Sequence, residues 1–250
     1  MHPLFERSIS RIRRHLLRQH PPASPWAVMG REYDRQTKMV FRKVLSPESC
    51  CLDMGAHVGE ILSMMQRFAP RGRHHAFEAL PHLAEGLRRR YPSVRVHQVA
   101  LSDRPGQAKF CFVENAPAWS GLQPRDYDIP DPHIRQIDVA MARVDDLVPA
   151  DARVDLVKLD IEGGEYHALL GARRTFTKHR PYLVMEAGRG STGRYGVQSR
   201  DMHGLLTGEF GLQVSTMFRW LTGAPPFTGD EFHENWEHGP DFYFLAYPSK

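Results

Sequence analysis

The first residues that could do chemistry follow an apolar segment. Asp53, Gly55 and Gly59 form the pattern D-x-G-x-x-x-G within CLDMGAHVG. Gly55 permits a tight turn and the close approach of a ligand to the backbone, and Gly59 permits close packing of a strand on a helix. A pyrophosphate site usually shows G-x-G-x-x-G, whereas a carboxylate ahead of the first glycine repels phosphate and attracts an ammonium group. The pattern favours a ligand with an amino-acid end, and an ordinary strand–helix turn is the alternative.

A second acidic residue, Glu78, ends the segment HHAFE. It comes about twenty residues after the glycine turn, where an acidic side chain can bind both hydroxyl groups of a ribose. Asp53 and Glu78 together favour a nucleoside with an amino-acid end, such as S-adenosylmethionine, but they still permit NAD. A solvated glutamate in a loop would explain Glu78 taken alone.

Three carboxylates, those of Asp160, Glu162 and Glu165, lie close together in the segment KLDIEGGE. Clustered carboxylates raise one another's pKa, which suits a general base, and they could also hold a hard cation such as Mg²⁺. Glu162 and Glu165 could instead cap a helix N-terminus, where negative charge is favoured. We expect Asp160 or Glu162 to be the base, with Glu186 or the loop residue His133 as the alternative. A divalent metal stays open, but we predict no metal site.

The elements that must position these residues alternate between strands and helices. Strands are predicted over 49–54, 73–78, 94–99, 108–113, 137–143, 154–159, 182–186, 212–217 and 242–247, and helices over 32–45, 58–69, 82–90, 164–175 and 201–208. This alternation with continuous apolar strands indicates an α/β fold, in which helices cover both faces of a mostly parallel sheet. In such sheets ligands bind beyond the carboxyl ends of the strands, where Asp53, Glu78 and Asp160 fall.

The beginning of the chain differs from the rest. Apolar residues recur at helical spacing among arginines over residues 3–19, and a proline-containing segment covers residues 20–26. We predict a basic amphipathic helix and linker over residues 1–27, followed by one catalytic domain over residues 28–250. The helix could lie on a membrane surface, but packing on the domain or on a second copy of the chain, as a homodimer, is favoured.

Composition excludes several classes of protein. Of the 250 residues 41% are hydrophobic, which is enough for a sizeable core, and the formal net charge of +4 is small for a dedicated nucleic-acid binder. The three cysteines lack the regular spacing of a disulfide framework and fit a reducing cytoplasm. No segment approaches the ~20 apolar residues of a membrane span. We therefore expect a cytoplasmic protein with no nucleic-acid partner and no stable membrane insertion.

Six motifs, in this order and spacing, resemble those of the FkbM family of methyltransferases. They are LDMGAHVG at 52–59, AFEALP at 76–81, VALSDRPG at 99–106, SGL at 120–122, VKLDIEGGEYHALLGA at 157–172 and RPYLVME at 180–186. The resemblance implies a Rossmann-like class I methyltransferase fold, whose sheet has seven strands and is antiparallel only at its last strand. It also implies S-adenosylmethionine as the cofactor and, usually, O-methylation of small molecules or sugars.

The resemblance also implies cofactor contacts for individual residues. Asp53 and Gly55 would hold the methionine part, Glu78 the ribose, and Asp160 would face the transferred methyl group. His57 stands where the family usually has asparagine, so polar contacts near the methionine end would differ. Ala100, Leu101 and Ser102 would frame the adenine. Tyr33 and Thr37 would form a lid over the cofactor.

We expect methyl transfer to a hydroxyl group of a small molecule or a sugar-containing metabolite. Loops 114–136, 188–200 and 220–240 should form the acceptor pocket, because such pockets differ between proteins of one fold. Trp119 and Trp220 could line this pocket or pack in the core. The alternatives are an RNA or N-methyltransferase, an NAD-dependent oxidoreductase on the same fold, and a non-catalytic binding protein. Asp53 argues against NAD, and the carboxylates at 160–165 argue against loss of catalysis.

Overall fold

The computed structural model describes residues 25–127, 129–239 and 241–249. The helix predicted over residues 3–19 lies outside the described residues. The chain divides into two compact units, Met1–Gln36 and Thr37–Lys250. Helix α2 spans Pro25–Val44, so it begins at Pro25 rather than near Glu32. Proline is well tolerated in the first turn of a helix, because its missing N–H has no partner there.

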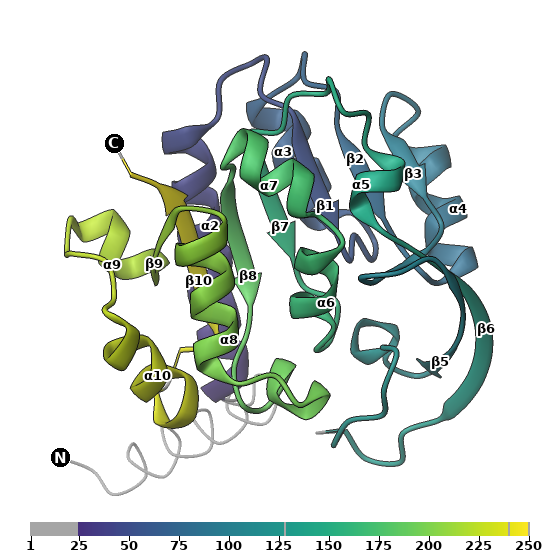
Figure 1. Cartoon of the computed structure of the whole chain (residues 1–250). Helices are drawn as coiled ribbons and strands as arrows, with labels where there is room; N and C mark the ends of the chain where they lie inside the picture. Colours follow the sequence, from purple (N-terminus) through teal and green to yellow (C-terminus); the bar gives the residue numbers. More distant parts are fainter. Residues whose placement is uncertain (1–24, 128, 240, 250) are drawn as a thin grey trace, which may run out of the picture. The chain divides into compact units, whose positions relative to one another are not determined.

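A seven-stranded sheet organises the unit Thr37–Lys250 (Figure 1), with the strand order β3-β2-β1-β7-β8-β10-β9. The strands are β1 (Cys51–Met54), β2 (His75–Phe77), β3 (Arg95–His97), β7 (Leu156–Leu159), β8 (Tyr182–Glu186), β9 (Leu212–Thr216) and β10 (Tyr243–Pro248). The first five strands in this order pair in parallel, and β10 is antiparallel to β8 and β9. The predicted sheet and its antiparallel last strand are confirmed.

Helices cover both faces of this sheet. They are α3 (Glu60–Phe68), α4 (Pro81–Arg90), α5 (Val144–Leu147), α6 (Glu165–Leu170), α7 (Arg173–His179), α8 (Ser199–His203), α9 (Met217–Thr222) and α10 (Gly229–His238). In Figure 1, α6, α7 and α8 lie in front of the sheet and α3 lies behind it. None of the helices in the described ranges is long and apolar enough to cross a bilayer.

One apolar core holds the strands to the front helices. Its buried members include Leu52, Met54, Val157, Leu159, Leu183 and Met185 from the strands and Leu169, Phe176, Met202 and Leu206 from the helices. Each such side chain contributes roughly 1.5–3 kcal/mol on burial. The order of strands reverses between β1 and β7, so their carboxyl ends open a crevice at the edge of the sheet, where ligands of such folds bind.

A second, three-stranded sheet stands beside this crevice. It consists of β4 (Ala100–Leu101), β5 (Gly106–Val113) and β6 (Ile134–Ala142), in the order β4-β6-β5. The sequence pattern predicted β5 and β6 but not their separation from the main sheet, because strand partners are chosen by tertiary contacts. The segment 114–133 between them contains the short 3₁₀ helix η1 (Pro117–Trp119). It returns to β5 through two backbone hydrogen bonds between Cys111 and Gly121.

Candidate active site

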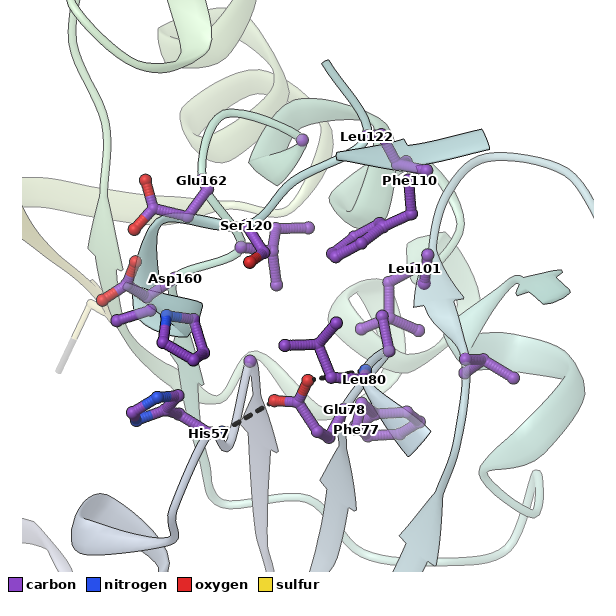
Figure 2. Close-up of a pocket in the computed structure, with 18 residues that line it drawn as sticks. His57, Phe77, Glu78, Leu80, Leu101, Phe110, Ser120, Leu122, Asp160 and Glu162 are labelled. Carbon is purple, nitrogen blue, oxygen red and sulfur yellow. Dashed lines mark hydrogen bonds between the residues drawn. The ribbon is translucent and has the colours of Figure 1, made fainter. Parts of the chain in front are cut away.

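The carboxyl ends of β1, β2, β4 and β7 surround one cavity (Figure 2). It contains about 590 Å³ of space not filled by protein atoms, part of which is open to solvent. Its walls include Gly55, His57, Phe77, Glu78, Leu80, Val99, Ala100, Leu101, Phe110, Ser120, Leu122, Asp160, Ile161 and Glu162. The structure therefore brings most of the predicted cofactor and base residues to one place.

The two sides of the cavity differ in polarity. Figure 2 shows His57, Asp160 and Glu162 on one side, and Leu101, Phe110 and Leu122 on the other. Glu78 lies between the two sides, at the end of β2. Such a cavity suits an elongated ligand with a charged end, a hydroxylated middle and an apolar, aromatic end.

The turn after β1 is held by backbone contacts. Gly55 has φ +84°, and a Cβ placed on it would lie 1.9 Å from the carbonyl oxygen of Asp160. The backbone that closely approaches Gly55 is therefore that of Asp160, after β7, and not that of a ligand as expected. Gly59 has φ +85°, and a Cβ there would meet Tyr91 and Leu87 at the end of α4. The expected tight packing at Gly59 is thus against a helix.

Asp53 lies in β1, just before this turn, and is 1% exposed. Neither of its carboxylate oxygens has a hydrogen-bond partner among the described residues. Burial raises the pKa of Asp53 to about 7. Asp53 does not line the cavity, so the structure places it behind the glycine turn rather than in the wall. A buried carboxylate without a partner favours a positive charge nearby, so Asp53 would act on a ligand through its electric field rather than by contact.

Glu78 is fixed by the backbone around it. Its Oε2 accepts a hydrogen bond from His57 N at 2.8 Å, and its Oε1 accepts one from Leu80 N at 2.8 Å. A carboxylate offers about four acceptor positions, so Glu78 could accept further hydrogen bonds from a ligand. Burial raises the pKa of Glu78. His57 has φ +47°, a conformation in which asparagine, aspartate and histidine are the tolerated non-glycine residues, so histidine can take the place that asparagine usually has.

Asp160 follows β7 and is held by two donors. Its Oδ2 accepts a hydrogen bond from Lys158 Nζ at 2.8 Å and another from the Tyr243 hydroxyl. Burial alone would raise the pKa of Asp160, but the positive charge of Lys158 and these hydrogen bonds lower it below its usual value. Burial and the negative charge of Asp160 raise the pKa of Glu186 well above its usual value. These shifts favour the ionised form of Asp160 and the protonated form of its neighbour Glu186.

The three predicted catalytic carboxylates form one group. Oxygen atoms of Asp160, Glu162 and Glu186 all lie within 4.8 Å of one another. Two cations already compensate this group, since Lys158 pairs with Asp160 and Arg125 pairs with Glu162. A hard divalent cation prefers oxygen ligands such as these. The absence of a metal site stays a prediction.

Glu165 holds the turn after β7 in place. It is 0% exposed, and its Oε1 accepts hydrogen bonds from Ile161 N and Gly163 N at 3.0 and 3.1 Å. Its Oε2 accepts one from Thr192 Oγ1 at 3.0 Å. All three bonds connect it to the protein itself. Glu165 is therefore a structural residue that shapes the wall around Glu162.

Other predicted residues lie outside the cavity. Ser102 borders a neighbouring pocket that shares Leu101 and Leu122 with this one. The Thr37 hydroxyl is buried and donates to the sulfur of Met217 at 3.5 Å. His133 is exposed beside Asp131. Tyr33, on the part of α2 that belongs to the unit Met1–Gln36, is buried.

Sequence reasoning missed three of the residues that shape the site: Lys158, Arg125 and Tyr243. Lys158 gave a usable signal, because it interrupts an apolar strand two residues before Asp160 and therefore points to the same side of it. Tyr243 and Arg125 gave none, since their contacts join segments distant in the sequence.

The sheet order, its antiparallel last strand and the crevice between β1 and β7 together define a Rossmann-like class I methyltransferase fold. The chain matches the family model of the methyltransferase FkbM domain over residues 53–210, and it belongs to this family. No curated protein matches its sequence significantly.

Three solved structures are among those similar to this chain. The methyltransferase FkbM from Methylobacillus flagellatus KT is 18% identical with a TM-score of 0.50, and the match covers 84% of this chain and 50% of that one. A TehB-like SAM-dependent methyltransferase from Corynebacterium glutamicum is 12% identical (TM-score 0.42, 100% of both chains). A precorrin-6y C5,15-methyltransferase from Geobacter metallireducens is 14% identical (TM-score 0.42, 86% of this chain and 87% of that one). This chain thus spans about half the length of the first.

Proposed function

We propose that this protein is an S-adenosylmethionine-dependent methyltransferase that methylates a hydroxyl group of a small molecule or a sugar-containing metabolite. The observation that carries the proposal is the arrangement of one cavity, which has an apolar side, Glu78 in the middle and Asp160, whose pKa is lowered, on the opposite side. Membership of the methyltransferase FkbM domain family supports the same class of reaction.

The cavity residues can be assigned to parts of the cofactor. Leu101, Phe110 and Ala100 would pack against the adenine, and Glu78 would accept hydrogen bonds from the ribose hydroxyls. His57, Gly55 and Asp160 would lie at the methionine end, with the buried Asp53 attracting its ammonium group from behind the turn. Thr37 and Ser102 lie outside the cavity, so the proposed cofactor contacts do not include them.

Asp160 is the residue proposed to take the proton of the acceptor hydroxyl. The cofactor supplies an activated methyl group on a sulfonium, so the protein must mainly align the acceptor and remove one proton. Lys158 and Tyr243 hold Asp160 Oδ2, and a further hydrogen bond joins the Asp160 carboxylate to Glu186. Burial and the negative charge of Asp160 raise the pKa of Glu186, which favours its protonated form beside the ionised Asp160. Glu162 lines the acceptor side and is neutralised by Arg125.

The electrostatics of the cavity favour a small acceptor over RNA. Glu78, Asp160 and Glu162 all face it, and a phosphate backbone is bound by arginine and lysine clusters. The two cations close to these carboxylates, Lys158 and Arg125, are both already paired. The cavity therefore presents no excess positive charge to a nucleic acid.

Isothermal titration with S-adenosylmethionine, S-adenosylhomocysteine and NAD tests the cofactor. The wild type and Glu114→Gln, which changes an exposed glutamate paired with Arg135, should bind the first two and not NAD. Glu78→Gln should weaken binding by roughly tenfold or more, since it removes a charged hydrogen-bond acceptor worth about 1.5–3 kcal/mol. Asp53→Asn should also weaken binding, because it removes the negative charge behind the glycine turn. Tight NAD binding, or equal affinity in all variants, would contradict the assignment.

Transfer of a radioactive methyl group to panels of alcohols, amines and RNA oligonucleotides tests the acceptor class. We expect label in hydroxyl acceptors. Label confined to amines or to RNA would refute O-methylation while leaving the methyltransferase class intact.

A further inference from the structure

Strand β6 has one edge that no other strand in the described part of the chain covers. It is the middle strand of the three-stranded sheet and pairs with β5 over eight residues. On its other side, β4 pairs only with Met141 and Ala142. The preceding residues of β6, 134–140, therefore form an open strand edge, and Figure 1 shows β6 outside β5, at the right of the view. We call residues 134–140 the open edge.

The hydrogen-bond pattern of the sheet identifies the backbone groups at the open edge. In an antiparallel pair, residues that bond to the partner strand alternate with residues whose N–H and C=O groups point away from it. Glu114 N donates to His133 O at 2.8 Å at the end of the β5–β6 ladder. Counting from this pair, Ile134, Gln136 and Asp138 direct their backbone N–H and C=O groups away from β5.

The far edge of β5 supports this assignment, because there the outward groups are visibly bonded. Cys111, which lies opposite Gln136, exchanges two backbone hydrogen bonds with Gly121 on the side away from β6. Val113 N donates to Ser120 Oγ at 3.0 Å on the same side. The segment after β5 thus covers part of that edge, whereas nothing among the described residues bonds the corresponding groups of the open edge.

The open edge is accessible and carries an apolar side chain. Ile134 is 45% exposed, and Gln136, Asp138 and Ala140 are exposed as well. Unpaired N–H and C=O groups along a strand edge can bond to a further strand, and such strand addition gains its affinity from main-chain hydrogen bonds. The open edge therefore has the accessibility and the free backbone groups that strand addition requires.

The charged side chains of the open edge are already compensated. Charges on an edge strand usually discourage association. Arg135 forms an ion pair with Glu114 at 2.8 Å, and Asp138 forms one with Lys109 at 2.8 Å. Both partners belong to the same sheet, so neither charge of β6 would enter a strand–strand contact unpaired.

The sequence of the open edge is complementary to itself when two copies run antiparallel. With Ile137 opposite Ile137 of a second copy, Gln136 lies opposite Asp138, and an amide faces a carboxylate. The same register places the exposed Ile134 opposite Ala140. Centring the pair on Gln136 would instead oppose Ile134 to Asp138, and centring it on Asp138 would oppose two carboxylates. The register centred on Ile137 is favoured over both.

We propose that two copies of this chain associate through β6, antiparallel and about a two-fold axis at Ile137, so that their three-stranded sheets join into one. The outward backbone groups of Gln136 and Asp138 bond to those of the second copy, and Ile134 is covered by Ala140. A two-fold contact is closed, because both copies use the same edge. This inference concerns assembly and does not depend on the proposed function.

Sedimentation equilibrium of the full chain over a range of concentrations measures the dimer. The mass should rise from 28.6 kDa toward twice that value. Gln136→Pro removes an outward N–H and leaves the bonds to β5 in place. It should raise the Kd of the dimer roughly tenfold or more, because each dimer loses two backbone hydrogen bonds of about 0.5–1.5 kcal/mol each. Ile134→Lys, which changes only an exposed side chain, should also raise the Kd.

Gln107→Pro is the matched control. Gln107 lies opposite Ala140 in β5, and its own N–H points away from β6. This proline also spares the bonds between β5 and β6, but it stands on the other edge of the sheet. The control should dimerise with the Kd of the wild type.

Cysteine cross-linking tests the register. Directly opposed residues that do not exchange hydrogen bonds have Cα atoms about 4.5 Å apart, which suits a disulfide. Ile137→Cys should therefore link two copies on mild oxidation. Asp138→Cys should not, because its Cα atoms in the two copies would be diagonal neighbours about 7–8 Å apart.

The proposal is overturned if the wild type stays monomeric at every concentration, or if Gln136→Pro and Ile134→Lys both dimerise as tightly as the control. A dimer that survives these changes would place the interface elsewhere, such as on the helix predicted over residues 3–19. Circular dichroism shows whether each variant is folded. If Gln136→Pro unfolds, the comparison of Ile134→Lys with the wild type decides. A disulfide through Asp138→Cys but not through Ile137→Cys would also overturn the proposed axis.

Discussion

Lys158→Met removes the charge that compensates Asp160 and keeps most of the apolar stem. Lys158 is 5% exposed, and its Nζ lies 2.8 Å from Asp160 Oδ2. Breaking a buried ion pair by removing one partner costs about 3–5 kcal/mol, because the remaining charge is left buried and uncompensated. The Asp160 side chain is 23% exposed, which moves the expected loss toward the lower end of this range. We therefore expect the free energy of unfolding to fall by about 3 kcal/mol at pH 8.

The chain contains a matched control for this substitution. Lys109 and Asp138 form the same type of pair at the same distance, 2.8 Å, but both side chains are 67% exposed. Exposed pairs contribute only about 0.2–1 kcal/mol. Lys109→Met should therefore cost at most about 1 kcal/mol, and the difference between the two variants isolates the effect of burial.

The loss in Lys158→Met should depend on pH. In the wild type the pKa of Asp160 lies below its unfolded value of about 3.9, so its contribution to stability is present above that pH and is lost as the pH falls through the folded pKa. Without Lys158, burial raises the folded pKa above the unfolded one. The folded variant then binds a proton more readily than the unfolded chain, so its deficit shrinks as the pH falls from 8 to 5.

Urea denaturation at pH 8 and pH 5 measures these differences. The double variant Lys158→Met/Asp160→Asn should regain part of the lost stability, because no buried charge remains. The reasoning is refuted if Lys158→Met costs no more than Lys109→Met, or if its cost is the same at both pH values and in the Asp160→Asn background.

Three further predictions address the base, the glycine turn and an acidic transition. Asp160→Asn should lower kcat by about a hundredfold or more while the Kd for S-adenosylhomocysteine changes less than about threefold; retained turnover of the best hydroxyl acceptor would exclude Asp160 as the base. Gly55→Ala should lower the free energy of unfolding by at least about 3 kcal/mol, because the new Cβ would lie 1.9 Å from the Asp160 carbonyl oxygen. Gly86→Ala, in helix α4 with open space around it, should instead raise it by about 0.5–1 kcal/mol. Thermal denaturation of the two variants measures the difference. Burial lowers the pKa of both His75 and His97 to about 4. The stability that these neutral histidines contribute above their unfolded pKa of about 6.5 should therefore be lost as the pH falls toward 4. The urea midpoint of His75→Phe should fall less steeply over this pH range than that of the wild type.

The position of the cavity could be predicted from local patterns. Asp53, Glu78 and Asp160 each stand at the end of a predicted parallel strand, and such strand ends meet at one edge of the sheet. Predicting that these residues lie at the carboxyl edge of the sheet required no knowledge of side-chain contacts. This is why Gly55, Glu78, Leu101 and Asp160 line one cavity in the structure.

The partners of these residues could not be predicted in the same way. Tyr243 reaches Asp160 across 83 residues of sequence, and this contact exists only because β10 inserts antiparallel between β8 and β9. Arg125 reaches Glu162 from a segment with no regular pattern. Ser102 has the expected place in the sequence, but it lines the neighbouring pocket. Contacts between side chains that are far apart in the sequence depend on the tertiary structure, and the periodicity of the sequence does not reveal them.

The distribution of compensated charge connects the two halves of the site. Asp160 and Glu162 are each paired with a cation, whereas Glu78 is bound only by backbone N–H groups and Asp53 has no hydrogen-bond partner among the described residues. The uncompensated carboxylates therefore lie beside the proposed ribose position and behind the glycine turn, whereas Asp160, at the proposed methionine end, is compensated by Lys158. Glu78 and Asp53 would attract a cationic cofactor, and the paired Asp160 and Glu162 would leave the side next to the acceptor close to neutral, which suits an uncharged acceptor.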